Sequence, residues 1–119
     1  MSELLVSIKE LLGVPTTVTE FDSQIVMHIN SVFIRLNLLN VGVIGYQITS
    51  TAGSITEFLP SSSDDSIFNM VLMYIFMKVR IVFDPPSSSF VMTALDTQIK
   101  ELEWLLTDYN ASLIEEPVV

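Results

Sequence analysis

The stretch from Lys78 to Leu106 decides the fold of this chain, and it reads KVRIVFDPPSSSFVMTALDTQIKELEWLL. An apolar helix runs into Asp84-Pro85-Pro86 and ends there, because proline lacks a backbone N–H and the residue before it avoids helical geometry. A second helix restarts at Ser88 or Ser89, either of which can cap it. The stretch contains no paired catalytic carboxylates, no metal-ligand spacing and no phosphate-binding loop. It therefore indicates helices that pack against other helices.

Apolar spacing predicts four helices in all. The first covers residues 2–12 and stops at Gly13. The second starts near Thr19, with Asp22 in a capping-box arrangement, and lasts until Gly42. The third runs from the Ser63-Asp64-Asp65 cluster to about Phe83. The seam of the fourth helix is close to a heptad spacing and consists of Val91, Leu95, Ile99, Leu102, Leu106 and Tyr109.

Residues 41–63 break the helical pattern. Ile44, Tyr46 and Ile48 alternate with small or polar residues, which favours a strand, and residues 55–59 either return as a second strand or begin a turn of helix. We expect an all-α, four-helix domain over residues 1–109, with a protruding loop or short β-ribbon within 41–63. Residues 110–119 are expected to form an extended acidic tail.

The composition limits the functions that are open to the chain. Half of its 119 residues are hydrophobic and its formal net charge is -9. So much apolar surface exceeds what one small core can hide, so subunit contacts or a membrane must cover the surplus. The acidic balance argues against binding to a phosphate backbone, although an acidic channel wall would let DNA slide without sticking. The third helix is apolar all round, but its length and its two cations favour a buried or interface helix over a membrane span.

Candidate catalytic and metal-ligating residues are few. His28 is the one histidine and the chain has no cysteine, so no zinc site is expected. Glu101 and Glu103 point to different faces of a helix, and the serine clusters have neither a partner histidine nor nucleophile-elbow glycines. We expect no enzyme activity, no cofactor and no metal.

The run KVRIVFDPPSSSFVMTAL, followed by QIKELEWLL, resembles the small helical head-tail connector proteins of tailed bacteriophages. The upstream run IVMHINSVFIRLNLLNVGV, then GYQI and ITEFL, matches the order of segments in that family. The likeness extends from about Leu4 to Leu106. It implies a structural protein of the virion neck, assembled in the host cytoplasm. Such connectors form a ring of about twelve subunits beneath the portal protein, extend the DNA channel, and present a surface to a stopper or tail-completion protein.

Three sets of residues are candidates for these contacts. Helix 63–83 supplies the predicted inter-subunit set, in which the two cations either reach solvent or pair with acids of a neighbour: Met70, Tyr74, Met77, Lys78 and Arg80. The fourth helix and tail supply the predicted portal-docking set: Trp104, Leu105, Tyr109 and Leu113. The loop supplies the set predicted to face the next neck or tail protein: Tyr46, Ile48 and Ile55.

Two other interpretations fit the residues alone. A soluble helical interaction or regulatory module predicts a defined monomer or dimer with no affinity for a portal. A peripheral or single-span membrane protein predicts that the chain needs detergent.

Overall fold

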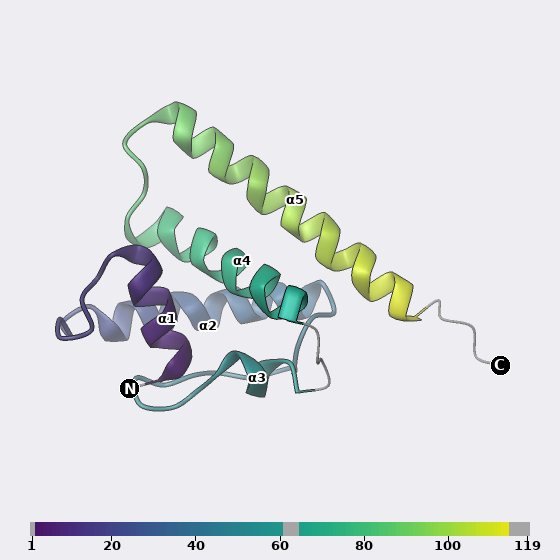
Figure 1. Ribbon diagram of the computed structural model, residues 1–119, viewed down its shortest axis with the longest axis horizontal. Helices are drawn as coiled ribbons and strands as arrows, with labels where there is room; N and C mark the ends of the chain where they lie inside the picture. Colours follow the sequence, from purple (N-terminus) through teal and green to yellow (C-terminus); the bar gives the residue numbers. More distant parts are fainter. Residues whose placement is uncertain (1, 61–64, 115–119) are drawn as a thin grey trace.

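The computed structural model describes residues 2–60 and 65–114, and for 109–114 it describes the backbone alone. Five helices and no strand occur in these ranges, so the all-α prediction is confirmed (Figure 1). The helices are α1 (Glu3–Leu12), α2 (Asp22–Leu38), α3 (Ile55–Phe58), α4 (Asp65–Phe83) and α5 (Ser89–Ile114).

Helix α1 has the local signals that its sequence predicts. The Ser2 side chain accepts a hydrogen bond from the backbone N–H of Leu5, and Gly13 ends the helix in the left-handed conformation, with φ 79°. Positive φ is easy for glycine because it has no Cβ. The buried face of α1 is formed by Leu4, Leu5 and Ile8.

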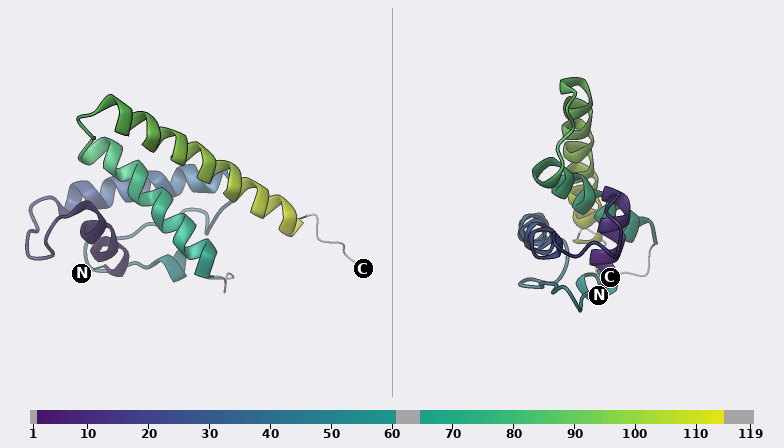
Figure 2. Two further views of the ribbon diagram at one scale, coloured as in Figure 1. Left: turned by 45° about the horizontal axis from the view of Figure 1, so that its top comes forward. Right: turned by 90° about the vertical axis from the view of Figure 1, so that its left-hand side faces the viewer.

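Helix α4 is the centre of the fold. It packs against α1, α2, α3 and α5, so neighbours of the same chain surround it (Figure 2). This position explains why its sequence is apolar all round. Its own fold nevertheless covers the helix only in part, since a third of its most apolar window is buried and Met73 and Val82 are exposed. Among the described residues, α4 is the one helix long and apolar enough to cross a membrane.

The turn between α4 and α5 follows the prediction. Helix α4 ends at Phe83, before the two prolines, and the Ser88 hydroxyl accepts a hydrogen bond from the N–H of Val91. Leu95, Ile99 and Leu106 form the buried seam of α5. The helix continues to Ile114, beyond the point at which an extended tail was expected to begin.

The predicted ribbon within residues 41–63 is wrong for the described residues, because the chain folds back onto the core and does not protrude (Figure 1). The Asn30 side chain takes the place of a partner strand. Its amide oxygen accepts from the N–H of Ile48 at 2.8 Å, and its amide nitrogen donates to the carbonyl of Ile48 at 3.1 Å. One asparagine thus satisfies the backbone groups that a second strand would otherwise satisfy. Val41, Ile48, Phe58 and Leu59 are buried as a result.

Helix α2 begins without the predicted capping box. Its cap position, Phe21, makes no side-chain cap hydrogen bond, and Asp22 instead binds Lys9 of α1. The ammonium of Lys9 is fully buried and lies 2.8 Å from Asp22 Oδ1, 2.6 Å from the carbonyl oxygen of Val18 and 3.4 Å from that of Thr16. One buried cation therefore joins the two helices and orders the chain between them.

Replacing Lys9 by alanine tests this arrangement. The substitution leaves the Asp22 carboxylate without its cation, and breaking one side of a buried pair costs about 3–5 kcal/mol. We expect a loss of that order in the free energy of unfolding measured by urea denaturation. The matched control is Lys100→Ala, which removes the exposed pair with Asp96 and should cost about 0.5 kcal/mol or less. Equal losses in the two variants would contradict the role given to Lys9.

Candidate functional site

The described residues contain no group of three or more histidine, aspartate or glutamate side chains able to hold a metal ion. His28 is half-buried on α2, beside Phe21, Met27 and Val82. The exposed apolar surfaces of the chain are candidate contact surfaces, and the geometry of those on α5 depends on how this helix is held.

Glu103 connects α5 to two other helices. One of its oxygens, Oε2, accepts a hydrogen bond from the Tyr74 hydroxyl of α4 at 2.6 Å and another from Arg35 Nε of α2 at 3.2 Å. Tyr74 is fully buried, so this hydroxyl needs a partner from the protein. The sequence does not indicate this link, because Arg35, Tyr74 and Glu103 lie far apart in the chain. The residues next to Glu103 in the sequence also do not distinguish it from an ordinary surface glutamate.

The environment of the three side chains keeps Glu103 charged. Partial burial alone would raise the pKa of the Glu103 carboxyl, but the hydrogen bonds from Tyr74 and Arg35 and the positive charges of Arg35 and Lys78 outweigh it and lower the pKa. Burial, together with the hydrogen bond to the Glu103 carboxylate, raises the pKa of the Tyr74 hydroxyl well above its ordinary value. The tyrosine therefore donates a proton in its hydrogen bond to a carboxylate, which is a strong arrangement.

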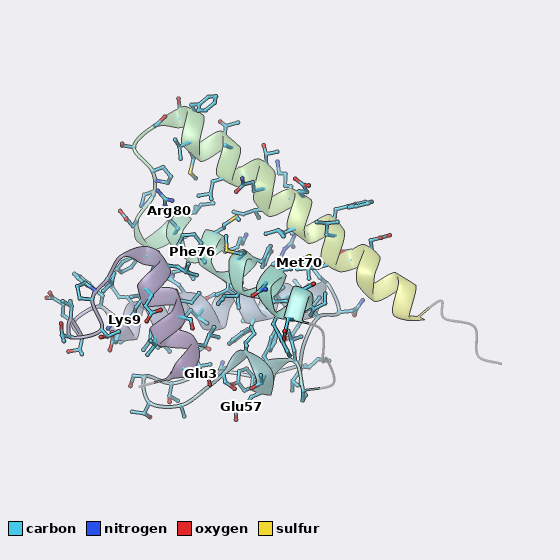
Figure 3. All side chains as sticks on the ribbon, viewed as in Figure 1. Glu3, Lys9, Glu57, Met70, Phe76 and Arg80 are labelled. Atoms are coloured by element: carbon cyan, nitrogen blue, oxygen red, sulfur yellow. The ribbon has the colours of Figure 1, made fainter. Side chains whose placement is uncertain are left out.

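The predicted inter-subunit residues divide between two sides of α4. Met70 and Met77 line an open groove between α4 and α5, and Figure 3 labels Met70 at this place. Tyr74 is buried on the side of α2, where Lys78 also lies near Glu103. Arg80 is half-buried beside Glu10 and Asp84, near the end of α1. The structure thus uses Tyr74 and Met77, which is 6% exposed, within its own subunit, and leaves Met70 half-buried at the groove.

The groove between α4 and α5 has a volume of about 410 Å³ and a mainly apolar wall. Methionine side chains suit such a surface because they are flexible and polarisable and adapt to the shape of a partner. The lining residues are Asn69, Met70, Met73, Met77, Gln98, Glu101, Leu102 and Leu105.

The predicted portal-docking residues lie along the second half of α5. Trp104 is 65% exposed, which is unusual for an indole in a folded domain without a partner. Leu105 is half-buried and lines the groove. Tyr109 and Leu113 lie on the helix, but their side chains are outside the described residues.

The residues predicted to face the next neck protein are less accessible than expected. Ile48 is 3% exposed, whereas Tyr46 and Ile55 are half-buried. The hydroxyl of Tyr46 accepts a hydrogen bond from the N–H of Ser54 at 2.9 Å. The exposed apolar side chain of this segment is instead Ile44, at 87%.

A further apolar surface lies on α2 and was not predicted. Met27, Ile34 and Leu38 are each at least 60% exposed. Their spacing of seven and four residues places them on one face, opposite the face that packs on α4. The spacing of these residues in the sequence was the available signal. They alternate along the chain with the residues of the buried face, so the second apolar face was not recognised.

The described part of the chain is therefore an all-helical protein with several exposed apolar surfaces. Such surfaces are typical of proteins that bind other proteins. A family model described as a phage connector protein matches residues 4–111, and the chain belongs to this family. The role of a connector is structural and its place is the head-tail neck of the virion. Comparisons with the curated proteins and with the solved structures gave no significant match.

Glu103→Gln tests the link between α5 and the other helices. The folded-state pKa of Glu103 is below its ordinary value of 4.5, so its charge contributes stability above that pH and the contribution is lost as the pH falls through the folded pKa. We expect the variant to lose about 1–3 kcal/mol of unfolding free energy at pH 7. The difference from the unsubstituted chain should shrink below pH 4.5 in urea denaturation. Glu101→Gln, on the other flank of α5, is the control and should show neither effect; a difference independent of pH for Glu103→Gln would refute the assignment.

Proposed function

We propose that this connector forms a ring of about twelve subunits beneath the portal protein, extends the DNA channel, and offers an attachment surface to the next neck or tail protein. The observation that carries the proposal is the family match over residues 4–111. Exposed apolar side chains on α2, on α5 and in the groove between α4 and α5 support it, because a ring that docks on one protein and receives another needs several separate contact surfaces.

The docking surface proposed for the portal is the second half of α5. Beyond its seam with α4 this helix is largely exposed, and Trp104 is its most prominent apolar side chain after Phe90. Aromatic side chains are enriched among the residues that dominate binding energy, which favours Trp104 as the anchor. Leu105, Tyr109 and Leu113 extend the same helix and are proposed to contribute.

The segment between α2 and α3 is proposed to face the next neck or tail protein. Its accessible apolar part is Ile44 with Val43. Tyr46, Ile48 and Ile55 then act as the support that holds this tip, since they pack on the core cluster.

The net charge of -9 suits the proposed channel. Like charges repel a phosphate backbone, so an acidic lumen would let DNA pass without adhering to the wall.

The first test is co-purification with the portal protein of the same phage, followed by negative-stain imaging. We expect a ring at the narrow end of the portal. A connector that stays a small free species in the presence of the portal would refute the proposal.

Trp104→Glu tests the docking surface. The side chain is exposed in the free subunit, so the fold should persist, whereas a charge at a buried hot spot should weaken portal binding roughly 30-fold or more, equivalent to about 2 kcal/mol. Phe90→Glu is the matched control, because Phe90 is 81% exposed at the opposite end of the same helix. Calorimetric titration measures both, and equal affinities for the two variants would rule out Trp104 as the anchor.

A further inference from the structure

The exposed face of α2 and the groove between α4 and α5 lie on opposite sides of the subunit. Figure 2 shows α2 on one side of α4. The hydrogen bond between Arg35 of α2 and Glu103 places the Glu103 side chain of α5 on that side. Glu101 and Leu105 line the groove. They are two positions from Glu103, and two residues span about 200° of an α-helix, so the groove opens away from α2.

The two surfaces are both mainly apolar. We call the exposed face formed by Met27, Ile34 and Leu38 the α2 ridge. Ridge residues at intervals of four and seven fit into the space between two packed helices. The groove is about 410 Å³ in volume and has Met70, Met73 and Met77 on one wall.

The charges are also compatible, because the ridge residues are neutral and Arg35, beside them on α2, is already paired with Glu103 of its own subunit. All 14 acidic residues lie outside residues 23–56, a run of 34 positions whose one formally charged residue is Arg35. The flank of α5 beside the groove carries the exposed acids Glu101 and Asp108. Two copies of a chain with net charge -9 repel each other, and the acid-free side of α2 is the surface that can approach an acidic neighbour without that penalty.

We propose that the α2 ridge of one copy seats in the groove between α4 and α5 of the next copy. The contact joins two different surfaces, so it is heterologous, and repetition of such a contact closes into a ring when the rotation permits. This inference rests on the proposed ring and names its inter-subunit contact. Met70 takes part in it, whereas Tyr74 and Met77 are buried within their own subunit.

The absence of cysteine from the chain allows a direct test by cross-linking. Ile34→Cys places one thiol on the ridge and Met73→Cys places one on the groove wall. The double variant is assembled with the portal protein, treated with a short flexible bis-maleimide and run on a denaturing gel. We expect a ladder of covalent oligomers from the double variant, and only covalent dimers from a mixture of the two single variants.

The controls separate this contact from others. Ile34→Cys alone should give no covalent dimer, because the ridges of two copies do not meet. Ile34→Cys combined with Phe90→Cys should give no ladder, since Phe90 is 81% exposed at the start of α5 and belongs to neither surface. A dimer from Ile34→Cys alone, or a ladder from the Phe90 pair, would overturn the inference.

Imaging of the same samples distinguishes the failure of this contact from the failure of the ring. Rings without a ladder would overturn the inference and leave the proposed function standing. The absence of rings with the portal present would overturn both. As an independent check, Ile34→Glu with Leu38→Glu should abolish the ring while the circular dichroism spectrum of the free subunit is unchanged, and Phe90→Glu should leave the ring intact.

Discussion

The hydrogen bonds of Glu103 determine where α5 lies, and the contact surfaces depend on that position. Helix α5 has 26 residues and makes its main packing contact with α4 alone. A seam along one helix fixes the distance between two helices better than it fixes rotation about that seam. The bonds from Glu103 to Tyr74 and Arg35 lie to one side of the seam and oppose such rotation. The groove on the other side and the exposed Trp104 are placed by the same restraint.

The packing of α4 accounts for part of the apolar composition, because four neighbouring helices cover some of its surface. The remaining exposed apolar side chains include those on the outer face of α2 and on α5, together with Ile44, Met73 and Val82. The surfaces available to other proteins are therefore on the periphery, as an assembly subunit requires, and the most apolar helix holds the subunit itself together.

The sequence predicted the features that depend on neighbours along the chain. Gly13, the two prolines and Ser88 act locally, so the ends of α1 and α4 and the start of α5 could be read directly. The features it missed depend on residues distant in sequence. Asn30 replaces a partner strand for Ile48, and Asp22 pairs with Lys9 in place of capping its own helix. Each of these polar side chains could also have bonded to solvent or to groups nearby in the sequence. Only the tertiary structure determines which partner each one has.

The same distinction explains the candidate site. Tyr74 and Met70 looked equivalent as inter-subunit residues because both lie on an apolar helix, yet Tyr74 is buried and directed at Glu103 whereas Met70 is half-buried at an open groove. The exposed fraction of a side chain distinguishes residues that pack within the subunit from residues that are accessible to a partner. The uneven distribution of acidic residues along the chain adds a second criterion. Residues 23–56 contain no acid, and they cover α2 after Asp22 together with the segment that follows it. In a strongly acidic chain, an exposed surface that is both apolar and free of acids is the one whose contact with another copy costs least electrostatically.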